Sequence, residues 1–310
     1  MSRSNQIELM GKSIILQDSL SLHEFSLLSQ LRKTPTVKTL LIRKNDTREL
    51  LIMRMIKKRS KISVPLLRIQ QEIQHPFICP VKYTFENSKR KYYVFDCFQT
   101  CGELINWSNN RLFDEETVKF YSACILLAVL HYHQNSIAYL NLNLENVLVD
   151  SQGYAKLISR EACGEIDNGE ISEFLAPEVI FKEKFGFSAD VWSLGAFIYK
   201  MLVGSRIYSK NQLLEKVDLE QLKFPSNISY EAKNLVEALL IKNPSQRLSE
   251  QEIKNHPWFA NIDWERLESK EIESPTLIRG EISQRIPLES NYQTQSARIF
   301  QAQDPIINTI

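Results

Sequence analysis

The feature that most constrains the fold is a single change of hydrophobic period near Gly102. Before it, from Phe25 to about Phe98, the chain consists of short β-type runs such as TVKTLLIRK, RELLIMRMI, KYTF and KYYVFDCF. After it, apolar residues recur at helical spacing, first in DEETVKFYSACILLAVLHYHQN, which has an acidic start and a basic end. The sequence therefore predicts an α+β protein in which a small, mainly antiparallel β lobe precedes a larger helical lobe.

The same patterns divide the chain into four parts. We expect an N-terminal extension over residues 1–18, a β lobe over 19–98, a helical lobe over 99–262 and a tail over 263–310. The tail is polar and aperiodic, so it is expected to be extended or partly disordered. Further helices are expected at residues 66–74, 190–203, 211–216, 230–241 and 249–255.

Composition excludes several classes of protein. Lys and Arg number 38 against 37 Asp and Glu, and no apolar run approaches the roughly eighteen residues of a membrane span. The first residues, MSRSNQIELMGKSIILQDS, lack the apolar core of a secretory signal. Five cysteines without a CxxC pair are expected to be reduced thiols. We therefore expect a cytoplasmic protein, or one in an assembly on the cytosolic side of an organelle or the cytoskeleton.

Glycine is scarce where a phosphate-binding loop would need it. The chain has nine glycines, and none lies between Lys12 and Cys101. Loops that cradle phosphate usually expose several backbone N–H groups at glycine. The first hundred residues are therefore not expected to form such a loop.

Five motifs follow one another at characteristic positions along the chain. They are HPFI at 75–78, YLNLNLENVLVD at 139–150, APE at 176–178, DVWSLG at 190–195 and NPSQRL at 243–248. Together the motifs resemble the eukaryotic protein kinase fold, which has two lobes. FPSNIS at 224–229, KNHPWF at 254–259 and IDW at 262–264 resemble the AGC group, typified by the cyclic-AMP-dependent kinase. The resemblance covers about 19–275 and implies that the tail is of the AGC type.

The resemblance places unusual residues where kinases hold nucleotide. Arg32, Thr34 and Val37 stand at the three glycine positions of the phosphate loop, and Arg54 replaces the phosphate-binding lysine. Leu66 replaces the glutamate that pairs with that lysine.

The adenine side of the pocket departs from the family as well. Ile52 replaces the small residue above adenine, which would narrow the pocket, and the residue behind the pocket is either Phe95 or Asp96. Arg54 could still bind an anion, or it could be an ordinary surface arginine.

The catalytic and metal positions are also changed. By resemblance, Asn141 replaces the aspartate that accepts the hydroxyl proton, and Asn143 replaces a phosphate-neutralising lysine. Ser159 replaces the main magnesium-binding aspartate, whereas Asn146 matches the second metal ligand. Asn146 could be a vestigial ligand or an amide that caps the loop. No metal site is expected.

The retained positions are structural ones. The resemblance pairs Glu178 with Arg247 inside the helical lobe and gives Asp190 the role of holding the catalytic-loop backbone. Three further positions match packing residues of the family: Trp192, Gly195 and Trp258.

These losses lead to the interpretation that the domain is a catalytically silent kinase fold, a pseudokinase, and not an enzyme. It would serve as a protein-binding scaffold, an allosteric regulator or a structural subunit, and no cofactor is expected. Two alternatives stay open. One is an unconventional or weakly active serine/threonine kinase that recruits Arg54, Asn146, Glu161 and Glu145 with ATP and magnesium, and the other is a nucleotide-binding switch without turnover.

A basic segment offers a partner surface. Residues 32–61 contain eleven Lys or Arg and two acids. The simplest interpretation of this segment is a strand face that is exposed to solvent. The more specific interpretation is a docking surface for an acidic protein or an active kinase. Nucleic acid is disfavoured because no aromatics interleave the charges. The candidate docking residues are Arg32, Lys33, Lys38, Arg43, Lys44, Lys57, Lys58 and Arg59.

Overall fold

The computed structural model describes residues 20–58, 73–96, 113–159, 163, 172–207 and 222–275. These residues belong to two compact units. The first unit contains residues 20–58 and 80–96, and the second contains 73–79 together with the described residues from 113 to 275. The helix expected at 211–216 and nearly all of the one expected at 66–74 lie outside the described residues.

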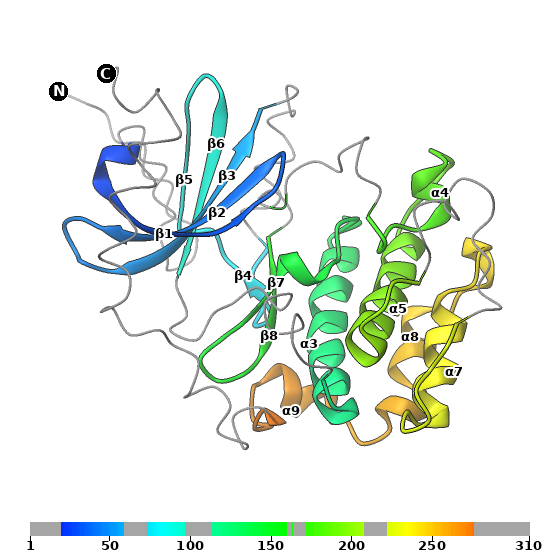
Figure 1. Ribbon diagram of the computed structural model, residues 1–310. Coiled ribbons are helices and arrows are strands. Elements are labelled where there is room, and N and C mark those ends of the chain that lie inside the picture. Colours follow the sequence, from blue (N-terminus) through cyan, green and yellow to red (C-terminus); the bar gives the residue numbers. More distant parts are fainter. Residues whose placement is uncertain are drawn as a thin grey trace. The chain divides into compact units, whose positions relative to one another are not determined.

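The first unit is a five-stranded antiparallel sheet with strand order β1-β2-β3-β6-β5 (Figure 1). A short 3₁₀ helix, η1 (Leu22–Glu24), precedes it. The strands are β1 (Phe25–Lys33), β2 (Val37–Lys44), β3 (Leu50–Lys57), β5 (Tyr83–Glu86) and β6 (Arg90–Asp96).

Alternation along these strands builds the core of the first unit. Leu40, Leu51, Met53 and Val94 are buried together on one face of the sheet, as the period of two requires. Phe25 of β1 packs against this cluster, so the edge strand closes the core. Burial of these apolar side chains provides most of the stabilisation of the sheet.

The second unit is built around two buried helices, α3 (Glu115–Gln134) and α5 (Ser188–Val203). The carboxylate of Asp114 accepts the N–H of Thr117 at 3.0 Å and so begins α3. Helix α5 packs against both α3 and α7 (Tyr230–Leu239) (Figure 1). Because α3 and α5 are apolar on almost every side, neighbouring elements cover them all round.

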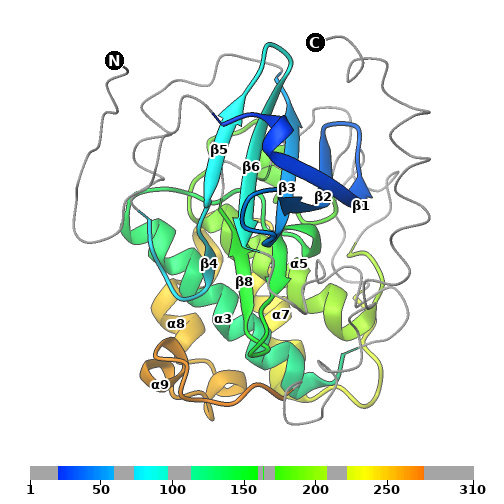
Figure 2. The same cartoon turned by 90° about the vertical axis from the view of Figure 1, so that its left-hand side faces the viewer.

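Shorter elements complete the second unit. A three-stranded sheet of order β4-β8-β7 packs against α3 through β8 (Figure 2). The shorter elements are β4 (Ile78–Cys79), η2 (Leu144–Asn146), β7 (Val147–Val149), β8 (Ala155–Ile158), α4 (Pro177–Ile180), η4 (Pro244–Gln246), α8 (Glu250–Lys254), η5 (Pro257–Phe259) and α9 (Trp264–Glu268).

Helix α9 corrects the expectation of an extended or partly disordered tail beyond residue 263. Asp263 caps this helix by accepting the N–H of Arg266 at 3.1 Å, and Leu267 is buried. The chain stays packed after the helix, since the Ser274 hydroxyl donates to the Gly153 carbonyl at 2.9 Å. Packing of Trp264 on Phe259, burial of Leu267 and a few hydrogen bonds order this largely polar segment. Residues 276–310 lie outside the described residues.

The predicted fold class is confirmed, because an antiparallel β unit and a mainly helical unit are both present. Helices α3, α5, α7 and α8 begin and end within a few residues of the positions expected, whereas α4 and α9 were not expected. None of the helices in the described ranges is long and apolar enough to cross a bilayer.

Candidate active site

Asp190 fixes the start of the segment between α3 and β7 that carries the candidate catalytic residues. Its two carboxylate oxygens accept the N–H groups of Tyr139 at 2.7 Å and Leu140 at 2.6 Å. Leu140 has a φ of 62°, a left-handed conformation that costs on the order of 1–3 kcal/mol for such a residue. Hydrogen bonds to a buried carboxylate are strong enough to hold this turn. Asp190 therefore positions the residues that follow.

A histidine completes the surroundings of Asp190. His133 Nε2 lies 2.9 Å from Asp190 Oδ2, and its Nδ1 lies 2.5 Å from Glu250 Oε1. Burial would lower the pKa of His133, but the hydrogen bonds and charges of Asp190 and Glu250 outweigh burial and raise it. Both carboxylates therefore favour the charged form of the His133 ring.

Three asparagines brace one another in this segment. Asn143 Oδ1 accepts the N–H groups of Glu145 at 2.9 Å and Asn146 at 3.1 Å, which caps η2. Asn143 Nδ2 donates to Asn141 Oδ1 at 2.9 Å, and Asn146 Nδ2 donates to the Asn141 carbonyl at 2.8 Å. The capping amide is thus Asn143, while Asn146 braces the backbone of Asn141.

The bond from Asn143 orients the side chain of Asn141. Its Oδ1 is held by Asn143, and no described residue accepts a hydrogen bond from its Nδ2. Asn141 is half-buried, so that Nδ2 can meet an incoming oxygen atom. An amide can orient a hydroxyl group but cannot remove its proton as a carboxylate does.

Ser159 follows β8, whose last residue, Ile158, is held by Tyr139. The Tyr139 hydroxyl donates to the carbonyl of Ile158 at 2.9 Å. Ser159 is 5% exposed, and within the described part of the chain its Oγ has no hydrogen-bond partner. This clamp was not foreseen, because only the tertiary structure places the Tyr139 hydroxyl at the end of β8.

The oxygens of Ser159 and Asn146 are the candidates for a metal site. Mg²⁺ prefers oxygen ligands and is usually held by one or two carboxylates together with substrate phosphates. The orphaned Oγ of buried Ser159 fits the role of a ligand, but both side chains are neutral, so the affinity would be low. No group of three or more metal-ligating side chains occurs among the described residues. Glu161 lies outside them.

In the first unit, strand register decides between Phe95 and Asp96. Ile52 of β3 pairs with Phe95 of β6, and Arg54 pairs with Tyr93, so these side chains share one face of the sheet. Asp96 lies on the opposite face and forms an ion pair with Lys82 at 2.9 Å. Phe95 is therefore the residue that shares a face with the two candidate nucleotide positions.

Burial settles the position of Arg54. Arg54 is 2% exposed, which excludes the alternative of a surface arginine. A buried guanidinium is costly unless neighbouring groups compensate its charge, and Arg54 does interact with neighbouring groups. The expected partner position, Leu66, lies outside the described residues.

The turn between β1 and β2 does not form a backbone phosphate cradle. The N–H of Thr34 donates to the Val37 carbonyl at 2.8 Å, and the N–H of Val37 donates to Thr34 Oγ1 at 3.0 Å. Pro35, between them, has no N–H to offer. The internal bonds replace the glycine loop that the sequence lacks.

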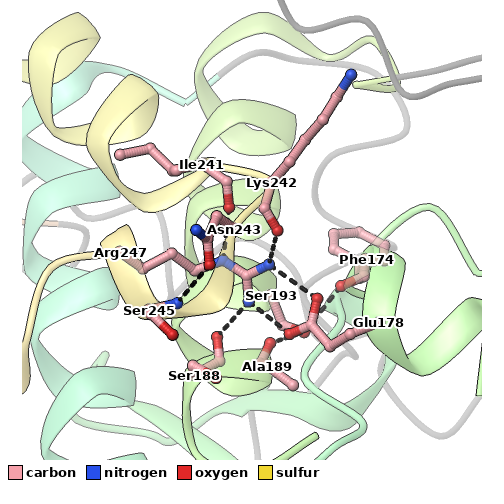
Figure 3. A network of polar contacts seen from close by, with 10 residues as sticks. All are labelled: Phe174, Glu178, Ser188, Ala189, Ser193, Ile241, Lys242, Asn243, Ser245 and Arg247. Atoms are coloured by element: carbon pink, nitrogen blue, oxygen red, sulfur yellow. Dashed lines mark hydrogen bonds and ion pairs between the residues drawn. The ribbon is translucent and has the colours of Figure 1, made fainter. Parts of the chain in front are cut away.

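Arg247 is the centre of a buried polar network in the second unit (Figure 3). Its Nη1 and Nη2 donate to the two oxygens of Glu178 at 2.6 and 2.8 Å, in a bidentate ion pair. Nη1 also donates to the Ser188 carbonyl at 2.8 Å, and Nε donates to the Ile241 carbonyl at 2.7 Å. This single side chain connects α4, the start of α5 and the end of α7.

The other retained residues pack around the same helices. The ring of Trp192 lies 5.0 Å from the Arg247 guanidinium. Gly195 lets α5 approach α7, because a Cβ there would lie 2.8 Å from the Cβ of Leu239. Trp258 donates its indole N–H to Glu115 at 2.8 Å.

Part of the basic segment is engaged within the first unit. Lys44 is buried and pairs with Asp46 at 2.5 Å, and Lys58 pairs with Glu86 at 2.8 Å. Lys33 and Lys57 are exposed. Arg32, Lys38 and Arg43 are half-buried, and Arg59 lies outside the described residues. The docking surface itself stays a prediction.

Comparison with known proteins places the chain in a family. Residues 33–259 match the protein kinase domain. "Protein kinase 2" of Dictyostelium discoideum is 35% identical over 271 residues, which are 81% of this chain and 56% of that protein. The "RAC family serine/threonine-protein kinase homolog" of Dictyostelium discoideum is 32% identical over 286 residues, 86% of this chain and 64% of that protein. Human "Ribosomal protein S6 kinase alpha-6" is 33% identical over 281 residues, 81% of this chain and 37% of that protein.

These matches bear on two expectations, namely that the chain is not an enzyme and that it is a silent scaffold. The expectation that the chain is not an enzyme is wrong, because the matched family and the named relatives are kinases. The relatives are of the AGC type, as the resemblance implied, but nothing supports catalytic silence or a scaffold role. The chain spans between about a third and two thirds of the length of these relatives. With a kinase-domain match over most of its length and relatives above 30% identity, the chain belongs to the protein kinase family.

Proposed function

We propose that this chain is an unconventional, weakly active serine/threonine kinase that transfers the γ-phosphoryl group of ATP to a protein hydroxyl group. The observation that carries the proposal is the ordered loop held by Asp190, in which Asn143 orients the Asn141 amide. A loop with no remaining use would not need a strained turn at Leu140 and a buried carboxylate to hold it.

The chemistry tolerates the loss of a carboxylate base. In phosphoryl transfer the bond from the γ-phosphorus to the bridging oxygen breaks as the substrate oxygen bonds to phosphorus, through a loose transition state. ADP leaves, and the hydroxyl proton passes late to a phosphoryl oxygen or to water. Asn141 can orient the hydroxyl by a hydrogen bond without removing this proton. General-base catalysis typically contributes 10²–10⁴-fold, so its absence slows the reaction without abolishing it.

ATP with magnesium is then a substrate complex of this proposal. The sequence led to the expectation that the chain needs no cofactor. The present proposal requires ATP and magnesium instead. Asn146 and Ser159 would offer neutral oxygens to Mg²⁺. Bound magnesium supplies charge neutralisation of the phosphates. With neutral ligands, we expect activity only at high concentrations of Mg²⁺ or Mn²⁺.

The test is transfer of radiolabelled γ-phosphate from ATP to a mixed serine and threonine peptide library. The full chain is compared with Asn146→Ala and with Tyr230→Ser, whose exposed side chain lies at the start of α7. We expect slow, metal-dependent transfer that Asn146→Ala lowers at least tenfold and Tyr230→Ser leaves unchanged. Melting curves identify variants that fail to fold. Activity that is absent, or equal in all three proteins as from a co-purifying kinase, would refute the proposal.

Several finer expectations stay predictions. The substrate protein, the docking residues of the basic segment and the cytoplasmic location are tested neither by the fold nor by the comparisons. The four-part division of the chain also remains a prediction apart from the ordered residues 264–275 noted above.

A further inference from the structure

The loop between α4 and α5 exposes an unusual concentration of aromatic side chains. Phe181, Phe185 and Phe187 are 51, 46 and 41% exposed, and they are half of the large exposed hydrophobic side chains among the described residues. All three lie within seven residues, which we call the aromatic loop (Phe181–Phe187). Exposed large apolar side chains concentrated in one short segment point to an interaction site.

The aromatic loop is held rigidly at both ends by one side chain. Arg247 binds the carboxylate of Glu178 just before the loop and the carbonyl of Ser188 just after it (Figure 3). Within the loop, the N–H of Glu183 donates to the Glu178 carbonyl at 2.8 Å. A loop fixed in this way loses little conformational entropy when a partner binds.

Individual residues of the loop are fixed as well. Phe187 stacks on His133, with ring centroids 4.4 Å apart and planes 16° apart. Lys182 has a φ of 57°, a conformation that costs energy for a non-glycine residue and turns the chain sharply after Phe181. The exposed rings are thus presented by a defined backbone.

Charge identifies the kind of partner. Lys182 and Lys184 are exposed and flank the single acid of the loop, Glu183, so that the loop carries a net positive charge. No residue of the described ranges forms an ion pair with either lysine. Exposed aromatic rings beside uncompensated cations are complementary to a segment that combines apolar side chains with carboxylates.

We propose that the aromatic loop is a docking site for an acidic segment of a partner protein, with apolar side chains that pack on Phe181 and Phe185 and carboxylates that pair with Lys182 and Lys184. The site is separate from the residues of the proposed transfer reaction. It therefore stands or falls independently of kinase activity.

The test is selection of displayed random twelve-residue peptides on the full chain, with a Phe181→Ser/Phe185→Ser variant used to remove peptides that bind elsewhere. We expect the enriched peptides to contain both Asp or Glu and large apolar residues. Their binding should weaken at least tenfold in that double variant and in Lys182→Glu/Lys184→Glu. It should also weaken with added salt, because exposed charges are screened.

The matched control is Tyr230→Ser, which removes an aromatic ring that is 76% exposed outside the loop. This variant should bind the enriched peptides as the wild type does. Absence of enrichment, enrichment of neutral or basic peptides, or unchanged binding by the loop variants would overturn the proposal. Self-association of the chain that is lost in the loop variants would also overturn it, since a second copy would then be the occupant.

Discussion

Two regions of the second unit differ in the charge of their side chains. Around Arg247, opposite charges are buried and paired at 2.6 to 2.8 Å. At Asn141, Asn143 and Ser159, the candidate catalytic side chains are neutral amides and a hydroxyl. Removal of one charge from the first region leaves its partner buried and unpaired, whereas the second region has no such charge to lose. The comparison teaches that the stability of this domain depends on the first region, whereas the proposed transfer chemistry depends on the second.

Arg247→Met should break the first region most strongly. It leaves the buried Glu178 carboxylate without its bidentate partner, and we expect a loss of about 3–5 kcal/mol in the free energy of unfolding. Urea denaturation measures this loss. The double variant Glu178→Leu/Arg247→Met should lose less, because no charge is left buried. A loss below about 1 kcal/mol in the single variant would contradict the comparison.

In the second region, Asn141→Asp should increase the rate of phosphoryl transfer. A carboxylate at this position can accept the hydroxyl proton, and we expect the rate of phosphoryl transfer to rise by roughly 10². Initial rates with labelled ATP give the change, and thermal melting should show stability close to that of wild type. The matched control, Asn141→Ala, should not increase the rate. Equal rates for wild type and Asn141→Asp would mean that residue 141 does not meet the substrate hydroxyl.

Gly195→Ala tests the packing of α5 against α7, beside the ion pair of Arg247 with Glu178. The added Cβ would lie 2.8 Å from Leu239 Cβ, so α5 and α7 must separate. Overpacking typically costs about 1–3 kcal/mol, and the better helix propensity of alanine offsets about 1 kcal/mol of that. We expect a net loss in urea denaturation. Gly186→Ala is the control, because a Cβ there meets nothing within 4 Å and should change stability little.

The smallest expected effect on stability is at His75, where the free energy of unfolding should depend on pH. Burial and repulsion by His131 lower the pKa of His75 to about 4, although Glu268 at 3.2 Å opposes this. The N–H of Phe77 donates to His75 Nδ1 at 3.1 Å, so the fold uses the neutral ring.

The sign of the pH effect follows from proton binding. An unfolded histidine titrates near 6.5, so between about pH 6.5 and about pH 4 the unfolded chain binds more protons than the folded one. The stabilisation is complete above pH 6.5 and falls as the pH decreases. We expect His75→Gln to flatten this fall between about pH 7 and about pH 5 in urea denaturation. An identical pH dependence in the variant would rule out this role.

The sequence predicted local features of the fold well. Strands β2 and β3 follow from their short runs of apolar and β-branched residues. Helix α7 follows from its apolar period together with Ser229, which caps it by accepting the Ala232 N–H at 3.1 Å. Helix α9 was missed, because three of its five residues are charged and the burial of Leu267 is visible only in the fold. Short elements of this kind depend on contacts from distant parts of the chain.

The candidate site was predictable in residue identity but not in geometry. Motif spacing pointed to Asn141, Asn143 and Asn146, yet the exchange of hydrogen bonds among them could not be read from spacing. The substitutions do not by themselves support the interpretation that the domain is catalytically silent. Loss of a base lowers a rate, and the loss alone does not define a protein as a non-enzyme.

By itself, the sequence determined the order of a β unit before a helical unit, the absence of a glycine-rich phosphate loop and the neutral character of the catalytic positions, because these depend on period and residue type alone. Only the tertiary structure decided that Phe95 rather than Asp96 shares a face with Arg54, since strand register sets that choice. The tertiary structure also decided that Arg247 holds both ends of the aromatic loop. Contacts between residues about sixty positions apart arise from packing, which no local pattern encodes.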